Sequence, residues 1–149
     1  MSDLYDLYQE MILDHSKKPR NRGSVEDATN QAHGHNPLCG DKIRVTVVLE
    51  GGVVKDLRFE GDGCAISTAS ASLMTESVKG RSREEVDRIF STFHALVTGQ
   101  KPDVPAEELG KLAVFSGVSE FPMRVKCATL SWHTLQAALD DASDPVSTE

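Results

Sequence analysis

Residues 43–59 read IRVTVVLEGGVVKDLRF, and this stretch decides the fold. Its first part places Ile, Val, Val and Leu at every second position over residues 43–49, which predicts a strand with one buried face. The sequence EGG then gives a turn signal, and a second strand follows over residues 53–59 with Lys55 interrupting its pattern. Because so short a turn joins them, we expect the two strands to pair as an antiparallel β-hairpin.

A helical pattern precedes this hairpin. Apolar side chains over residues 3–14 recur at i, i+3, i+4 and i+7, which predicts an amphipathic helix. The basic stretch over residues 17–23 contains a proline and ends this helix. Residues 24–38 are polar, with little periodicity and many loop-forming residues, and we expect a loop there.

Helical patterns also follow the hairpin. Small Ala and Ser residues begin at Ala65, and Gly80 fits the position just beyond a helix end. Ser82 and Glu85 form a capping-box sequence that opens the next helix. The loop and the two helices expected after it span residues 99–105, 106–115 and 127–140. Strands followed by helices in this order predict an α+β fold.

Length and composition indicate one globular domain. The chain has 149 residues, and we assign residues 1–140 to a single domain and expect the acidic segment 141–149 to be a disordered tail. Hydrophobic residues make up 39% and charged residues 26%, which is ordinary for a soluble protein. A net charge of −7 without a basic stripe argues against a nucleic-acid-binding protein.

Signals for secretion or membrane insertion are not found in the sequence. The N-terminal stretch MSDLYDLYQE has neither a basic region nor an apolar core of the kind that secretory signals carry. No apolar run approaches the roughly 20 residues that cross a bilayer. We therefore expect a cytoplasmic protein with no membrane partner.

The three cysteines, Cys39, Cys64 and Cys127, are the main candidates for a functional site. Their odd number and the reducing compartment expected for this chain argue against a disulfide framework. Three alternatives remain: thiols packed as small apolar side chains, a nucleophile, or a set of metal ligands.

The predicted hairpin brings two of these cysteines together. Cys39 and Asp41 precede its first strand and Cys64 follows its second, so we expect these side chains to be close in space. Cys64 and Cys127 also stand at or near predicted helix starts, where the helix dipole favours a thiolate. Three thiolates and one carboxylate suit a tetrahedral zinc site. The glycines and aspartates around the cysteines are unusual surroundings for packed core thiols, which favours the metal site.

Other residues carry weaker signals. Arg124 and Lys126 precede the third cysteine and could offset the negative charge of such a site. His33 and His35 are a second candidate ligand pair, although we expect them to be exposed loop histidines. Two histidines on predicted helices are expected to pack against other side chains or to face solvent: His94 and His133.

Three motifs resemble a known family. They read NPLCGD at residues 36–41, GDGCAIS at residues 61–67 and RVKCATL at residues 124–130. In this order they resemble the iron–sulfur assembly proteins of the NifU N-terminal/IscU type, and the resemblance extends over residues 4–139.

Two features resemble the SufU branch of this family more than its IscU scaffolds. Scaffolds usually carry a histidine immediately before the third cysteine, where this chain has Lys126. The segment over residues 94–118 is similar to the additional stretch that SufU-type proteins carry between the second and third cysteines.

The resemblance implies a fold, a metal and a partner. The fold is an α+β domain whose helices pack on a small antiparallel sheet. The cofactor is Zn²⁺, and its implied ligands are Cys39, Asp41, Cys64 and Cys127. Cys39 would accept persulfide sulfur from a PLP-dependent cysteine desulfurase of the SufS type, stimulate that enzyme, and pass the sulfur to downstream cluster-assembly proteins. Arg124 and Lys126 are expected to contact the persulfide or the partner.

Two other functions stay open. Cysteine thiolates also hold iron–sulfur clusters, so the same ligands support a scaffold that carries a [2Fe–2S] cluster. Lys126 and the additional stretch over residues 94–118 argue against the scaffold. A zinc-stabilised interaction module without sulfur chemistry is the second alternative.

Overall fold

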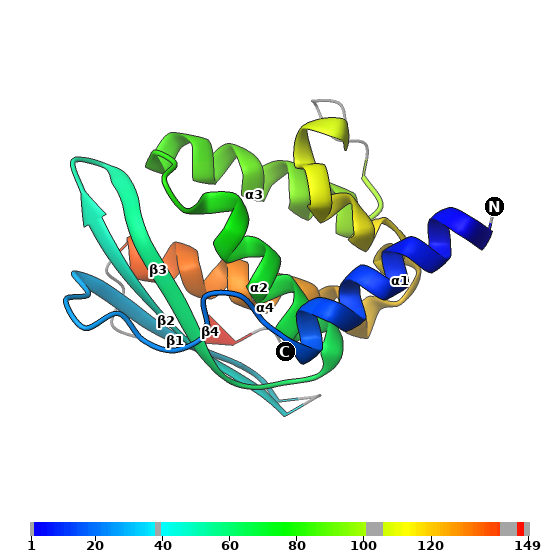
Figure 1. Ribbon diagram of the computed structural model, residues 1–149, viewed down its shortest axis with the longest axis horizontal. Helices are drawn as coiled ribbons and strands as arrows, with labels where there is room; N and C mark the ends of the chain where they lie inside the picture. The colour runs from blue at the N-terminus through cyan, green and yellow to red at the C-terminus, as the bar shows by residue number, and fades with distance from the viewer. Residues whose placement is uncertain (1, 38–39, 101–105, 141–145, 148–149) are drawn as a thin grey trace.

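The α+β architecture expected from the sequence is confirmed. A computed structural model describes residues 2–37, 40–100, 106–140 and 146–147. Its elements in chain order are α1 (Ser2–Lys17), β1 (Asn30–Asn36), β2 (Asp41–Glu50), β3 (Val53–Asp62), α2 (Ala65–Val78), α3 (Arg83–Val97), the 3₁₀ segment η1 (Ala106–Glu120), α4 (Pro122–Leu139) and β4 (Val146–Ser147). The helices gather on one side of the sheet (Figure 1).

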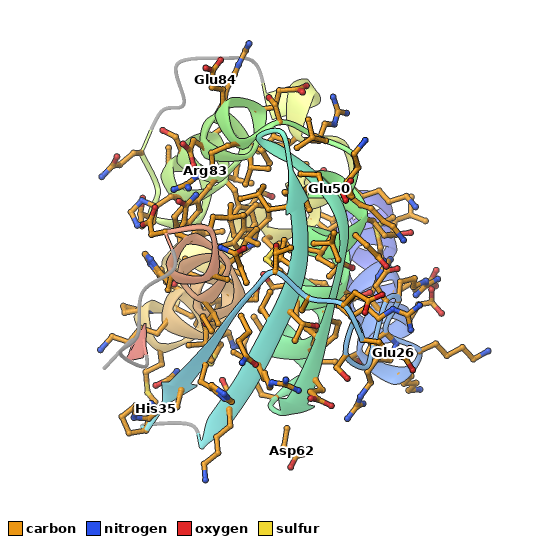
Figure 2. The ribbon with its side chains drawn as sticks, turned by 90° about the vertical axis from the view of Figure 1, so that its left-hand side faces the viewer. Glu26, His35, Glu50, Asp62, Arg83 and Glu84 are labelled. Atoms are coloured by element: carbon orange, nitrogen blue, oxygen red, sulfur yellow. The ribbon has the colours of Figure 1, made fainter. Side chains whose placement is uncertain are left out.

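The sheet has the strand order β3-β2-β1-β4. The first three strands pair antiparallel, and the short β4 pairs parallel with β1. Gly51 and Gly52, with φ values of 58° and 77°, turn the chain between β2 and β3, in a conformation that glycine adopts without strain. The predicted hairpin is therefore confirmed. Figure 2 turns the open face of this sheet toward the reader, with His35 and Asp62 at one end and Glu50 at the other.

Strand β1 lies within the polar stretch that we expected to be a loop, so that expectation is wrong. Along it, Ala32, Gly34 and Asn36 are buried and alternate with exposed residues. Only one of the three buried residues is a hydrophobe, so the alternation of burial is not visible as an alternation of hydrophobicity. A Cβ atom at Gly34 would overlap Thr134, so the glycine lets α4 pack directly on the strand.

The core lies between the sheet and helices α2 and α4. Its sheet side is made of fully buried apolar residues such as Val45, Val47 and Leu57. Its helical side contains an aromatic stack in which Phe93 lies 4.9 Å from Trp132, measured between ring centroids. Helix α3 is held by the predicted capping box, because Ser82 and Glu85 each accept a hydrogen bond from the other's backbone N–H.

Two predicted helices differ from those in the structure. The segment predicted as a helix over residues 106–115 is a 3₁₀ segment that runs to Glu120 and is interrupted at Gly110. The last helix begins at Pro122 and not at residue 127, because proline at a first helical position needs no backbone N–H partner. Cys127 therefore lies in the second turn of α4, inside the helix and not at its start.

The C-terminal segment contains one described element. Within residues 141–149, expected to be a disordered tail, Val146–Ser147 forms β4 beside Gly34 and His35 of β1. The other residues of this segment lie outside the described part of the chain. Among the described residues, none of the helices combines the length and apolar character that crossing a membrane requires.

Candidate metal centre

Three elements that are distant in sequence converge at one end of the sheet. Asp41 is the first residue of β2, Cys64 is the N-cap of α2 and Cys127 lies in α4. One carboxylate oxygen and the two sulfur atoms of these residues all lie within 4.8 Å of one another. Asp41 and Cys127 are buried, whereas Cys64 is exposed, so the cluster opens to solvent on one side. Cys39, the fourth predicted ligand, lies outside the described residues.

The β2–β3 hairpin brings Asp41 and Cys64 together. Lys42 pairs with Asp62, so the chain leaves β3 beside the start of β2 and enters α2 three residues later, at Ala65. The Cys64 backbone N–H donates to Asp41 Oδ1 at 2.9 Å, and the Cys64 sulfur lies 3.8 Å from Asp41 Oδ2. The same sulfur accepts a hydrogen bond from the Ser67 backbone N–H at 3.4 Å. Cys64 is therefore fixed by both its backbone and its side chain.

A buried asparagine holds the third side chain of the cluster. Asn36, at the end of β1, donates a hydrogen bond from Nδ2 to the Cys127 sulfur at 3.6 Å. This contact fixes the position of the Cys127 side chain. The hydrophobic pattern gave no hint of this residue, and its one sequence signal is its place in the NPLCGD motif. We expected the free N–H groups of a helix start to act on Cys127, but Cys127 lies in the second turn of α4. A side-chain donor, Asn36 Nδ2, contacts its sulfur instead.

The surroundings of Cys64 favour its ionised form. Its pKa is lowered to about 6, chiefly by a hydrogen bond with the Cys127 thiol and further by the backbone N–H groups of Ser67 and Ile66. Burial and the negative charge of Asp41 act in the opposite direction. The helix N-terminus predicted from the sequence thus contributes through its free N–H groups.

The donor set fits a divalent cation. A buried carboxylate and two thiol sulfurs within 4.8 Å place groups of like charge together once the thiols ionise. Such a cluster is costly in a partly dry site unless a cation neutralises it. Two sulfurs and one oxygen match the ligand preferences of zinc, which binds four ligands in closed structural sites.

The two basic residues before Cys127 differ in their surroundings. Arg124 is exposed, and its guanidinium lies 4.6 Å from the ring centroid of Phe121. Lys126 is half-buried on α4. The structure thus places Arg124 beside an aromatic ring, and a contact of either residue with a persulfide or a partner stays a prediction.

The exposure predicted for the candidate ligand pair, His33 and His35, is confirmed. His33 and His35 are exposed residues of β1, on a strand and not in a loop. The helical histidines, His94 and His133, are half-buried and pack around Phe90.

An apolar groove of about 700 Å³ lies beside the cysteine cluster. Helix α1, the 3₁₀ segment η1 and the start of α4 form its walls, with Ile12, Leu13, Val118 and Phe121 among the lining side chains. Ile66, which also lines the groove, lies two residues after Cys64. Part of the additional stretch over residues 94–118 thus forms a wall of a groove that adjoins the cluster.

Comparisons with known proteins agree with this geometry. The family profile described as the NifU-like N terminal domain matches residues 7–141. The zinc-dependent sulfurtransferase SufU of Bacillus subtilis is 44% identical over 135 residues, which cover 91% of this chain and 90% of that protein. The iron–sulfur cluster assembly scaffold protein IscU of Streptococcus pyogenes is 41% identical over 140 residues, covering 93% of this chain and 86% of that protein.

A solved structure shows the same fold. The crystal structure of a protein from Fervidobacterium islandicum, described as an iron–sulfur cluster assembly scaffold for the SUF system, superposes with a TM-score of 0.83. It is 36% identical, and the match covers 91% of this chain and 98% of that one. With the profile match over most of its length, this chain belongs to the NifU-like N-terminal domain family.

Proposed function

We propose that this chain is an iron–sulfur cluster assembly protein that acts as a zinc-dependent sulfurtransferase of the SufU type. The observation that carries the proposal is the convergence of Asp41, Cys64 and Cys127 within 4.8 Å from three separate elements. A fourth candidate donor, Cys39, lies two residues before Asp41 in the sequence. The 44% identity to the zinc-dependent sulfurtransferase SufU of Bacillus subtilis supports the same function.

The residues that would hold zinc are Cys39, Asp41, Cys64 and Cys127. Bound zinc would stabilise the thiolates and, because its ligands come from separate elements, would tie those elements together. The carboxylate is a harder donor than a thiolate, so a site with one Asp exchanges ligands more readily than an all-cysteine site. This lability suits a centre in which one cysteine must leave the metal before it reacts.

Cys39 is the sulfur acceptor in this proposal. Cys64 is fixed as the N-cap of α2, and Cys127 is buried inside α4 with a hydrogen bond from Asn36. Cys127 would have to leave the helix interior to reach a partner, and a new bond at the exposed Cys64 sulfur would compete with the N-cap hydrogen bond from Ser67. In the transfer step, the Cys39 thiolate attacks the outer sulfur of the partner's cysteine persulfide, a new S–S bond forms, and the partner's cysteine leaves as a thiolate.

The partner would be a PLP-dependent cysteine desulfurase of the SufS type, and the apolar groove is its proposed docking surface. Leu13 and Phe121 line this groove and are also exposed, and a contiguous exposed apolar surface is typical of a site that binds another protein. The groove adjoins the cysteine cluster through Ile66, so a partner bound there would lie next to Cys64.

A scaffold function is the second candidate, and specific relatives favour it. IscU scaffold proteins of Streptococcus pyogenes and Thermotoga maritima are 41% and 40% identical to this chain. Three thiolates and one carboxylate would also hold a [2Fe–2S] cluster. A brown purified protein with visible absorbance would favour the scaffold, and a colourless protein with one equivalent of zinc would favour sulfur transfer.

The decisive experiment measures sulfide release by a cysteine desulfurase in the presence of this chain. We expect the wild-type chain to stimulate release and to gain one sulfur atom on Cys39 by mass spectrometry. The Cys39→Ala variant should lose both effects, whereas the neighbouring Leu38→Ala variant should keep them. Full stimulation by Cys39→Ala would overturn the sulfur-transfer proposal.

A further inference from the structure

We infer that a cavity between α3 and α4 is a second metal site, in which the imidazoles of His94 and His133 bind one divalent transition-metal ion. This inference is independent of the proposed function. It rests on the distance between the two rings, on the aromatic contacts that hold them, and on the polar cavity beside them.

The two imidazoles are close enough to share an ion. Their ring centroids lie 6.1 Å apart, and the ring planes meet at 78°. Two imidazoles that bind one ion, with metal–nitrogen bonds of about 2.1 Å, have centroids about 5–6.5 Å apart. The observed separation of His94 and His133 falls within that range, so the two rings lie at a distance that one shared ion can span.

Aromatic packing holds both rings in place. Phe90, one turn before His94 on α3, makes edge-to-face contacts with His94 at 6.0 Å and with His133 at 5.2 Å, measured between ring centroids. Phe90 in turn stacks on the fully buried Trp132 at 5.8 Å. Because this support extends into the core, the two imidazoles lose little conformational freedom when they bind a metal.

The cavity has the room and the polarity that a hydrated ion needs. It has a volume of about 610 Å³, and its lining includes Asp87, Ser91, Gln100 and Gln136 beside the two histidines. The Asp87 carboxylate accepts a hydrogen bond from Gln136 Nε2 at 2.9 Å, which joins α3 to α4 at the cavity wall. Polar side chains of this kind can bind the water molecules that complete the coordination of a two-histidine site.

The donor chemistry differs from that of the cysteine cluster. Two imidazole nitrogens without a thiolate suit Ni²⁺, Cu²⁺, Zn²⁺ and Fe²⁺, and affinity for Ni²⁺ exceeds that for Fe²⁺ at a given site. His133 follows Cys127 by six residues on α4, which places it about 9 Å further along the helix and about 120° around it. The two sites therefore face different sides of one helix.

The test uses the untagged full chain, loaded first with a single equivalent of zinc so that the cysteine cluster is filled and the histidine pair stays free of zinc, and titrated with NiCl₂ by calorimetry. We expect one further equivalent of nickel to bind while the zinc content stays constant. His94→Gln and His133→Gln should each weaken nickel binding by at least the roughly 10–100-fold that loss of an outer-shell partner costs a metal site. His33→Gln and His35→Gln are matched controls, because these exposed histidines on β1 form the other histidine pair, and they should leave nickel binding unchanged.

A second measurement on the wild-type chain does not depend on how the variants fold. Paramagnetic nickel should broaden the imidazole proton signals of His94 and His133 in NMR spectra before those of His33 and His35. The inference would be overturned if no nickel binds beyond the zinc-filled cluster. It would equally be overturned if the His33→Gln or His35→Gln change removes the binding while His94→Gln and His133→Gln retain it.

Discussion

Asn36 and Cys127 are joined by a hydrogen bond from the amide Nδ2 to the thiol sulfur, at 3.6 Å, between the end of β1 and the second turn of α4. Both residues are buried. The contact links the position of one candidate zinc ligand to the end of β1, and it gives a first prediction about metal retention.

Asn36→Ala should weaken zinc retention, because it removes the donor directed at the Cys127 sulfur. Loss of a buried hydrogen-bond partner costs about 1–3 kcal/mol of stability. Transfer of zinc to a coloured chelator should become faster in this variant. Asn30→Ala is the matched control, since Asn30 on the same strand donates to the Ala138 carbonyl and not to the cluster. Equal chelator kinetics in the two variants would contradict the prediction.

Gly34→Ala should destabilise the fold by steric overlap, because the added Cβ would meet Thr134 and approach Leu130 Cδ1 to 3.2 Å. Overpacking of this kind lowers the free energy of unfolding by about 1–3 kcal/mol, which urea unfolding would measure. In the double variant Gly34→Ala with Thr134→Ala, the clash with Thr134 disappears. We expect the double variant to be more stable than the sum of the single effects predicts. Strict additivity would show that the two residues do not touch.

His15 should make stability depend on pH. Its pKa is lowered below the ordinary 6.5, chiefly by burial and further by the charge of Arg20, while its Nδ1 lies 2.7 Å from the Ser72 hydroxyl. Between the lowered pKa and 6.5, the unfolded chain binds a proton that the folded chain resists. The contribution of His15 to stability is therefore fully present above pH 6.5, and it is lost as the pH falls through the folded-state pKa.

Urea unfolding between pH 7.5 and pH 5 checks this prediction, and both values bracket the ordinary histidine pKa of about 6.5. We expect His15→Gln to lower the free energy of unfolding at neutral pH. Between pH 7.5 and pH 5, the free energy of unfolding of this variant should fall less steeply than that of the wild-type chain. His35→Gln, which changes an exposed histidine of β1, should keep the wild-type slope. An unchanged slope in His15→Gln would assign the pH dependence to other groups.

Leu13→Ser should reduce stimulation of a cysteine desulfurase without altering zinc content, because Leu13 lines the apolar groove and is 49% exposed. Leu7→Ser is a matched control on the same helix, since Leu7 is 60% exposed and is not among the residues that line the groove. The measurement is the concentration of this chain that gives half-maximal sulfide release. The two variants should differ in that concentration, and equal behaviour would exclude the groove as the docking surface.

The hairpin and the start of α3 could be predicted because each has a local cause. Alternation of apolar residues defines β2, and the reciprocal Ser82–Glu85 hydrogen bonds define the start of α3. Strand β1 could not be predicted in this way, since its buried positions are filled by Ala32, Gly34 and Asn36 and not by large hydrophobes. Burial there is set by the tertiary packing of α4 on the strand.

Three of the four predicted ligands lie together in the described part of the chain, but not all of their geometry could be predicted. Hairpin pairing alone places Asp41 beside Cys64, and the structure shows this arrangement. The surroundings of Cys127 depend on where α4 begins, and Pro122 opens this helix five residues before the predicted start. The contact of Asn36 with Cys127, 91 positions away, is not encoded by local patterns.

Helix α4 carries both Cys127 and, five residues later, Trp132, the single tryptophan of the chain. The indole stacks on Phe93 and Phe90 and donates from Nε1 to the Ser70 hydroxyl of α2, the helix capped by Cys64. Any adjustment of the two helices that accompanies ligand exchange at the cysteines is thus transmitted to one chromophore. Its intrinsic fluorescence offers a label-free signal for following that exchange in real time.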